Sequence, residues 1–290
     1  MNCQAYLKDG FLYVGFNQSS MVFDEIQYTL GDGAMSFSSL PDNILKIMFG
    51  TFRSEFLFSL EKRETEKELL NTLKEYVRLS SEINPYLNFY LDIYVYFLLC
   101  LWGQRNEIPR LLRSFVCDSG RYNIDSMDFS NIPESSLWLA GVLIEDIKIR
   151  QSRLKEDCEA IIGGAEEPSG LTSMQRLYLL SKQGKNYLSG EFRTTLAPDY
   201  FPMPEGDFDR IKSTLLNNKV DIVEVAEIKK LDDLLSFELF HTLKSNLIIR
   251  RCKHCGEFFI VRGRIDIEYC DRIKPGETKP CSIIGASRSY

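Results

Sequence analysis

The pattern of hydrophobic and polar positions divides the chain into a strand-like start and a helical remainder. Short apolar runs bounded by turn residues occupy 5–7, 11–14, 21–30 and 34–37. Asp9-Gly10 separates the first two runs, and this dipeptide favours the tight turn of a β-hairpin. We therefore predict a small β-rich element over residues 1–60, whose last part, 44–58, is already helical in character.

From residue 61 onward, apolar side chains recur every three or four positions, which is the spacing of one buried helix face. The stretches with this pattern are 69–80, 87–102, 108–117, 135–149, 171–183, 208–216 and 231–247. Alternating apolar and polar residues over 220–228 predict one half-buried strand. The glycine-rich run 163–170 is the strongest interruption, either a domain boundary or a long surface turn. We predict a mainly helical protein, α+β overall, with a helical body over 61–247.

The most apolar helix, 87–102, is the one candidate for a membrane span. It is 16 residues long and contains Asn88 and Asp92, whereas a spanning helix needs about 20 predominantly apolar residues. We therefore predict a buried core helix and no membrane partner. Because Met1 is followed by neither a basic nor a continuous apolar region, no secretion signal is visible and we expect a cytoplasmic protein.

Composition and charge narrow the function classes. The chain has 290 residues, of which 44% are hydrophobic and 26% charged, as in an ordinary globular protein. The net charge of −6 argues against a protein whose whole surface binds nucleic acid. The charge is uneven, because 244–290 holds ten basic and five acidic residues, giving +5 there and −11 elsewhere. The basic segment therefore needs an explanation of its own.

Four of the eight cysteines lie in this basic segment, at Cys252, Cys255, Cys270 and Cys281. Two residues separate the first pair and glycine follows it, so a tight turn can place both thiolates on one side. The apolar run 258–261 predicts the second half of a short hairpin. Four thiolates around one ion make a closed tetrahedral zinc site. We predict a treble-clef or ribbon-like zinc module over 248–290, with one structural Zn²⁺.

Two other interpretations of the cluster compete with this one. His254 lies between the first two cysteines, but we expect its side chain to point away from the neighbouring thiolates. The four cysteines would otherwise be free core thiols or a redox pair. A segment this short and charged has too little apolar surface to fold by burial alone, and structural zinc contributes on the order of 10 kcal/mol to small modules. The pattern therefore favours metal.

The run 250–286 resembles the C-terminal signature of an uncharacterised bacterial family that is common in Firmicutes, a domain of unknown function. That signature reads C-x-x-C-G-x-x-F, then Y-C-D-R, then T-C-x-x-x-G-A. The matching positions are Cys252, Cys255, Gly256, Phe259, Tyr269, Cys270, Asp271, Arg272, Cys281, Gly285 and Ala286. Pro280 stands where threonine is frequent, which does not affect the metal ligands. The first cysteine pair also resembles, less closely, that of CGNR-type zinc fingers in bacterial regulators, a likeness that implies DNA binding.

Basic residues of the segment alternate with Phe258, Phe259 and Tyr269, a combination suited to phosphate contact and base stacking. The candidate residues for contact with nucleic acid or a partner are Arg250, Arg251, Lys253, Arg262, Arg264, Arg272 and Lys274. Four thiolates and one Zn²⁺ lower the charge of the segment from +5 to about +3. The same cations can therefore serve instead to neutralise the metal site or to dock the module on the acidic body.

We expect a cytoplasmic bacterial zinc protein that contacts nucleic acid or a protein partner, in a regulatory or phage-defence role, and that leans towards being non-enzymatic. The alternative is an enzyme such as a nuclease, with its site in the helical body and a purely structural zinc. The chain has two histidines, His241 and His254, and no P-loop, G-x-G-x-x-G or H-E-x-x-H motif. We expect His241 to be a surface or packing residue on its helix. Catalytic residues and oligomeric state stay unassigned.

Overall fold

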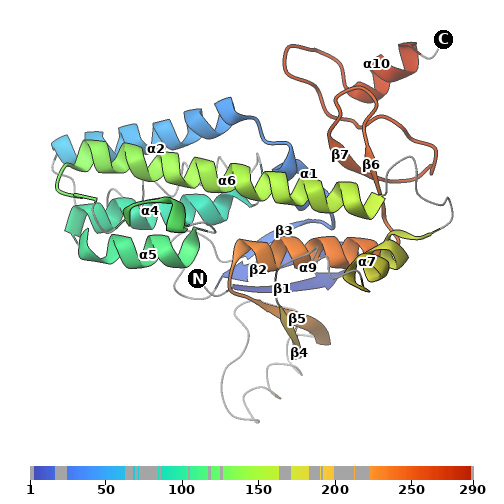
Figure 1. Cartoon of the computed structure of the whole chain (residues 1–290), viewed down its shortest axis with the longest axis horizontal. Helices are drawn as coiled ribbons and strands as arrows, with labels where there is room; N and C mark the ends of the chain where they lie inside the picture. Colours follow the sequence, from blue (N-terminus) through green and yellow to red (C-terminus); the bar gives the residue numbers. More distant parts are fainter. Residues whose placement is uncertain are drawn as a thin grey trace.

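The protein is described by a computed structural model. The residues that it describes are 3–16, 25–62, 68, 71, 84, 86–103, 105–116, 119–124, 127–162, 171–182, 190, 192–198, 212 and 222–288. The predicted helices at 69–80 and 208–216, and the glycine-rich run 163–170, lie outside this part of the chain apart from isolated positions. The predicted class, mainly helical with small β elements, is confirmed (Figure 1).

Five strands form one antiparallel sheet in the order β3-β2-β1-β5-β4. The strands are β1 (Cys3–Lys8), β2 (Phe11–Phe16), β3 (Glu25–Thr29), β4 (Arg193–Pro198) and β5 (Ile222–Ile228). The first two strands form the predicted hairpin, and both Asp9 and Gly10 in its turn have positive φ. The predicted strand at 220–228 is also present, as β5. It pairs with β1 and places Ala5 opposite Ala226, so the sheet joins the start of the chain to a segment far along the sequence.

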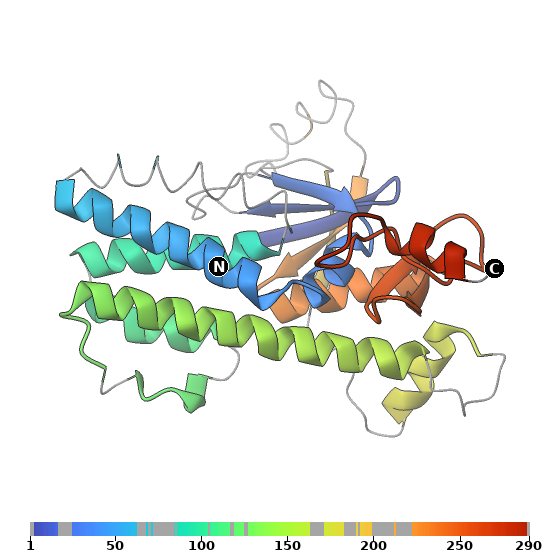
Figure 2. The same ribbon diagram turned by 90° about the horizontal axis from the view of Figure 1, so that it is seen from above.

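Helices α2, α4 and α6 build most of the helical body, by which we mean α1 to α9. The helices of the body are α1 (Asp32–Ser38), α2 (Asp42–Lys62), α4 (Leu87–Gly103), α5 (Ile108–Phe115), α6 (Ile132–Ile162), α7 (Ser173–Lys182) and α9 (Leu231–Lys244). Two short 3₁₀ turns, η1 (Arg105–Glu107) and η2 (Ser119–Arg121), flank α5. Figure 2 shows that α6 runs from the end of the body near α5 to α7. It packs on α1, α2, α4 and α7 along the way.

The run 34–37, which we expected to extend the β pattern, is helical, so that interpretation is wrong. The chain turns at Gly31, where φ is 88°, and enters α1. The carboxylate of Glu238 on α9 accepts hydrogen bonds from the backbone N–H groups of Gly31 at 2.7 Å and Ala34 at 2.8 Å. It therefore satisfies amides that a helix start leaves unpaired. A contact across 204 residues induces this helix, and no local pattern reveals it.

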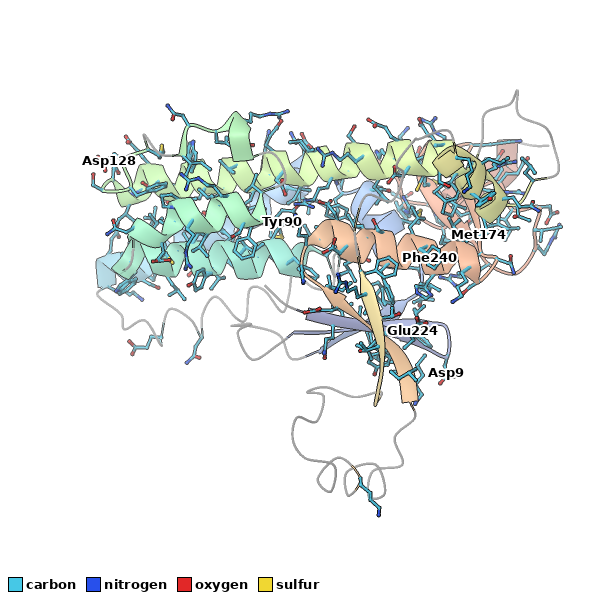
Figure 3. All side chains as sticks on the ribbon, turned by 60° about the horizontal axis from the view of Figure 1, so that its bottom comes forward. Asp9, Tyr90, Asp128, Met174, Glu224 and Phe240 are labelled. Atoms are coloured by element: carbon cyan, nitrogen blue, oxygen red, sulfur yellow. The ribbon has the colours of Figure 1, made fainter. Side chains whose placement is uncertain are left out.

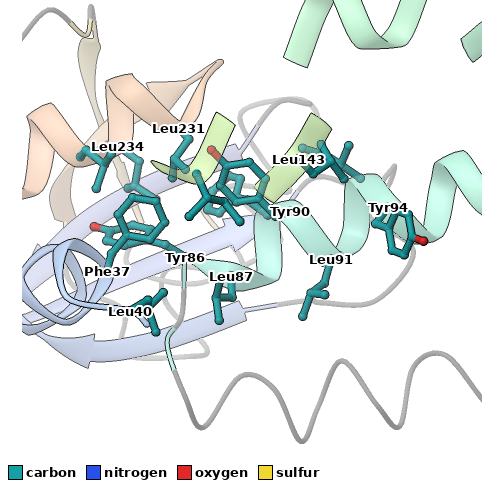
Figure 4. Packing of buried hydrophobic residues seen from close by; sticks show 14 of the residues in the cluster. Phe37, Leu40, Tyr86, Leu87, Tyr90, Leu91, Tyr94, Leu143, Leu231 and Leu234 are labelled. Carbon is teal, nitrogen blue, oxygen red and sulfur yellow. The ribbon is translucent and has the colours of Figure 1, made fainter. Parts of the chain in front are cut away.

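The predicted core helix is confirmed as α4, most of whose apolar side chains are buried together with Tyr90 and Tyr94 (Figure 4). These two tyrosines can be buried because each hydroxyl has a hydrogen-bond partner. Tyr90 donates to Asp146 at 2.7 Å, and Tyr94 donates to the Ser136 carbonyl at 2.9 Å. No helix among the described residues is both long and apolar enough to cross a membrane.

Helix α9 packs on β5 of the sheet and on α7. Figure 3 marks Phe240 on this helix and Glu224 on the strand. The helix begins as its acidic first turn predicts, since the Asp233 side chain accepts a hydrogen bond from the Lys230 N–H at 2.9 Å. Its end leads within a few residues into the cysteine segment, and so ties that segment to the core of the body.

The segment after α9 forms what we call the cysteine module, residues 248–288. It contains a hairpin of β6 (Ile248–Arg251) and β7 (Phe258–Val261), a loop, and α10 (Cys281–Arg288). Strand β7 contacts α1, and β6 contacts α6 (Figure 1). All four side chains of β7 are buried. Phe258 and Ile260 belong to the core of the body, whereas Phe259 and Val261 pack beside the cysteines, so the strand has a buried environment on both faces.

Candidate metal centre

The four predicted cysteine ligands lie together, with their Sγ atoms all within 4.8 Å of one another. Cys252 follows β6, Cys255 precedes β7, Cys270 lies in the loop and Cys281 begins α10. The Sγ atoms of Cys255 and Cys270 are 3.6 Å apart, far beyond a disulfide bond of about 2.05 Å. A tetrahedral zinc site with Zn–S bonds of ~2.3 Å separates its sulfurs by about 3.8 Å. The arrangement therefore fits a metal better than a redox pair.

The first two cysteines are positioned by a tight turn between β6 and β7. The Gly256 N–H donates to the Cys252 carbonyl at 2.9 Å, and the Cys252 N–H donates to the Glu257 carbonyl at 2.9 Å. Gly256 has a φ of 78°, in the left-handed region that glycine enters without strain. This is the role that the sequence predicts for the glycine after the cysteine pair.

The last two cysteines are joined by backbone hydrogen bonds across the loop. The Cys281 N–H donates to the Arg272 carbonyl, and the Ser282 N–H donates to the Cys270 carbonyl, both at 2.9 Å. Gly285 on α10 lies against the ring of Tyr269, where an added Cβ would come within 2.3 Å of a ring carbon. The module therefore consists of a hairpin, a loop and a helix that begins at the last cysteine.

The thiols differ in how easily they ionise. Burial opposes ionisation of Cys252, but hydrogen bonds from the backbone N–H groups of Cys255, Cys270 and His254 outweigh it and lower its pKa to about 6. Burial raises the pKa of Cys270 to about 11 and that of Cys281 further. A metal ion must therefore displace protons from the later thiols, which makes its binding depend on pH.

His254 is not part of the cysteine cluster. Its Nε2 lies 2.9 and 3.0 Å from the two carboxylate oxygens of Glu277, which belongs to the loop between Cys270 and Cys281. The imidazole therefore ties the first cysteine pair to the second. Sequence reasoning missed Glu277, since nothing in its spacing distinguishes it from a solvated charge.

Three of the seven predicted contact residues reach the helical body. Arg262 donates to the Leu30 carbonyl at 2.8 Å and to Asp32 of α1 at 3.0 Å. Arg272 donates to the Ser39 hydroxyl at 2.9 Å and also to the Phe258 carbonyl. The third, Arg251, lies 3.4 Å from Glu159 of α6. The partners on the body were not identifiable from the sequence, because they are spread over more than a hundred residues.

The other four predicted contact residues stay within the module or face solvent. Arg250 donates to the Ile267 carbonyl at 3.1 Å, and Lys253 pairs with Glu268 at 2.5 Å. Arg264 donates from Nε to Asp266 at 3.0 Å. Lys274 is exposed, and its side chain has no partner among the described residues. Six of the seven predicted contact residues therefore have a partner inside the chain, and four of the six pair with a carboxylate.

The two parts also interlock through apolar and opposite-charge contacts. An added Cβ on Gly31 would lie 2.8 Å from Cγ1 of Ile260, so the glycine makes room for β7. Lys155 of α6 lies 3.0 Å from Glu257 of the module. The structure therefore contains specific contacts of the kind expected if the module docks on the body, which was the alternative to nucleic-acid contact.

Among the described residues, the cysteine cluster is the only group of three or more metal-ligating side chains within reach of one ion. Two cavities in the helical body, both lined in part by Arg150, hold only about 20 and 30 Å³. His241 packs against Phe237, with ring centroids 4.4 Å apart, and burial lowers its pKa. The enzyme alternative therefore gains no support from this part of the chain, and it stays a prediction.

Comparison with known proteins adds one match. A family model described as a family of unknown function (DUF6076) matches residues 210–290. The matched region includes β5, α9 and the whole cysteine module, which is less than a third of the chain. No curated protein and no solved structure matches the chain. The cysteine module is therefore similar to an uncharacterised family, as its signature residues suggested, and the match assigns no activity.

Proposed function

We propose that this is a non-catalytic zinc protein in which one Zn²⁺, bound by Cys252, Cys255, Cys270 and Cys281, holds the cysteine module together. The observation that carries the proposal is the convergence of four thiols from the hairpin turn, the loop and the helix start. Four thiolates suit zinc and leave no open position for a substrate or a reactive water. Thiolate ligands also favour the reducing cytoplasm.

We further propose that the docked module presents a surface to a protein partner. Its cations are mostly engaged by carboxylates and carbonyls of the same chain, so few remain for phosphates. Its exposed side chains include three isoleucines, Ile265, Ile273 and Ile283, each more than half exposed. The backbone pairs Ile273 with Pro280, and the Ile283 N–H donates to the Pro280 carbonyl, which brings two of them to one region. A regulatory or phage-defence role would use this surface.

The experiment is metal analysis followed by site-specific crosslinking in cells that express the chain. We expect one zinc per chain, and a photo-crosslinker at Ile273 should form a specific protein adduct. The same crosslinker at Leu137, an equally exposed apolar position on α6, is the matched control and should form none. Zinc-free protein would contradict the metal, whereas equal adducts at both positions would contradict the partner surface.

Nucleic-acid contact is the second candidate, supported by the exposed Lys274 and Lys279 in the loop between Cys270 and Cys281. Electrostatic binding of this kind weakens steeply with salt. A gel-shift assay at low salt should then show binding to DNA or RNA that Lys274→Gln and Lys279→Gln reduce. Absence of any shift at low salt would remove this candidate and leave the protein partner.

A further inference from the structure

A cavity of about 430 Å³ lies where the cysteine module meets α1. Its apolar lining comes from Met35, Phe259, Ile260 and Ile267. Its polar lining comes from Asp32, Ser36, Arg262, Tyr269, Asp271 and Arg272, together with Cys270 of the cysteine cluster. The volume lies in the range of roughly 300–1,000 Å³ that small-molecule sites occupy, whereas the two cavities in the body have volumes of only about 20 and 30 Å³. The junction of the helical body and the cysteine module therefore contains a cavity in addition to the contacts described above.

Several polar groups of this cavity are available to a ligand. The Tyr269 hydroxyl and the Asp271 carboxylate have no hydrogen-bond partner within the described part of the chain. Arg262 uses Nη2 for its contacts with Leu30 and Asp32, and its Nε and Nη1 have no partner among the described residues. Arg272 uses both Nη atoms and keeps Nε. Each guanidinium is thus held in place by the fold while it retains donors of its own.

The aromatic side of the cavity is held rigidly. The Tyr269 ring rests against the backbone of α10 at Gly285, where no larger residue fits. Phe259 is buried beside the cysteine cluster, and Tyr269 packs against the same cluster. Because these side chains are already ordered, little of their conformational entropy is lost when a ligand binds.

Charge and shape narrow the chemistry of the ligand. Two guanidinium groups favour an oxyanion, which arginine binds through paired N–H donors. The carboxylates of Asp32 and Asp271 balance this charge, so a ligand must also offer a hydrogen-bond donor to be preferred over a simple anion. The apolar floor and the phenylalanine and tyrosine rings suit a flat ring system.

The geometry points to a binding site for a small molecule that joins an oxyanion to a flat ring carrying a hydrogen-bond donor. A nucleoside monophosphate and an aromatic amino acid both have this chemistry, with phosphate or carboxylate as the oxyanion. The lining of the cavity does not include Ile265, Ile273 or Ile283 of the proposed partner surface, so neither proposal requires the other.

The experiment is calorimetric titration of the full-length, metal-loaded protein with adenosine monophosphate and with L-tryptophan. One of the two should bind, at least about tenfold more tightly than its fragments, which are adenosine and inorganic phosphate in one arm and tryptamine in the other. The arm that succeeds identifies the oxyanion. Binding of neither compound, or binding of the fragments as tight as that of the whole compound, would overturn the proposal.

Two variants locate the binding, and one matched control tests its specificity. Arg262→Gln and Asp271→Asn should each weaken binding about tenfold or more with the metal content unchanged. Arg264→Gln changes an arginine of the same module that does not line the cavity, and it should leave binding intact. If Arg262→Gln loosens the module, Asp271→Asn still decides, because no described contact depends on that carboxylate. Unchanged binding in Asp271→Asn, or an equal loss in Arg264→Gln, would place the ligand elsewhere.

Discussion

The helical body and the cysteine module are stabilised by different means. The body buries a continuous core of aromatic and aliphatic side chains, such as Phe49 of α2 and Tyr94 of α4. The cluster within the module contains only Phe259 and Val261 besides buried cysteines. A long chain can bury enough apolar surface to fold, whereas about forty residues cannot. We therefore expect the cysteine module, unlike the helical body, to depend on a bound metal for its stability.

The two parts meet along β7, which belongs to both. Phe258 and Ile260 complete the core of the body, and Phe259 and Val261 cover the cysteines. Metal binding and docking are thus coupled through one strand of four residues. The following experiments test how far the two parts remain separate, beginning with the largest expected effect.

The largest effect is expected from Cys281→Ser, or from chelation of the metal, which tests whether the module depends on a metal that the body does not need. We expect the module to lose on the order of 10 kcal/mol of metal-binding free energy and to unfold, while the helical body stays folded. Limited proteolysis read by mass spectrometry should then cut within 248–288 first, with far-UV circular dichroism largely retained.

Cys158→Ser is the matched control, because Cys158 is fully buried in the body and outside the cluster. It should keep one zinc per chain. A Cys281→Ser protein that still binds zinc at full stoichiometry would contradict the four-ligand site, and one that loses all helical structure would contradict the independence of the body.

We expect the stability of the helical body to depend on apolar packing, just as we expect that of the cysteine module to depend on metal. Phe49 is buried, and its ring centroid lies 5.1 Å from that of Tyr94. Phe49→Ala should lower the free energy of unfolding by about 3–5 kcal/mol through the cavity it leaves. Urea unfolding followed by tryptophan fluorescence measures this effect, since both tryptophans lie in the body.

The exposed residue Leu137 provides the comparison for that experiment, and Leu137→Ala should change the free energy by no more than about 0.5 kcal/mol. Zinc content should be unaffected in both variants. Loss of zinc from Phe49→Ala would show that the two parts unfold as one unit.

Glu238 makes the stability of the helical body depend on pH, because all of its hydrogen-bond partners lie in the body. Burial raises its pKa from 4.5 to about 7, although hydrogen bonds from Tyr86, Gly31 and Ala34 oppose the rise. The folded state therefore binds this proton more tightly than the unfolded state. Its contribution to stability is complete below pH 4.5 and is lost as the pH rises through about 7. The loss amounts to up to about 3 kcal/mol.

Urea unfolding between about pH 5 and pH 8 measures this loss. Glu238→Gln keeps the shape of the side chain without the charge, and it should flatten the pH dependence over that range. An equal slope in the wild type and the variant would assign the dependence to other groups.

The smallest effect is expected for the ion pair between Arg251 and Glu159 at the junction. Both side chains are exposed, at 63% and 55%, and 3.4 Å separates the two charged atoms. A double-mutant cycle should give a coupling of about 0–1 kcal/mol. The pair of Arg121 and Glu145 within the body, similarly exposed, is the matched control and should couple as weakly. A clearly larger value at the junction would mean that charge, rather than β7, docks the module.

Local patterns predicted the elements whose causes are local. The hairpin at Asp9-Gly10, the core helix α4 and the turn at Gly256 each follow from a few neighbouring residues. Helix α1 escaped prediction because its first amides are capped by Glu238, far away in the sequence. The hairpin of β1 and β2 could be predicted from the sequence, but the pairing of β1 with β5 could not, because β5 lies far along the chain.

For the candidate site, spacing alone identified the four cysteines, because a tight turn and a short loop can bring them together in almost any fold. It did not reveal where the basic residues point. Arg262 and Arg272 meet Asp32 and Ser39 only because α1 forms and lies beside β7.

The sequence by itself determined the helical character of the body and the set of thiols available to a metal, since periodicity and spacing are properties of neighbouring residues. Only the tertiary structure decided that most of the predicted contact residues of the module have partners within the chain, and that a cavity lies at the junction. Those outcomes depend on long-range contacts, which bring carboxylates and guanidinium groups together from segments with no common pattern.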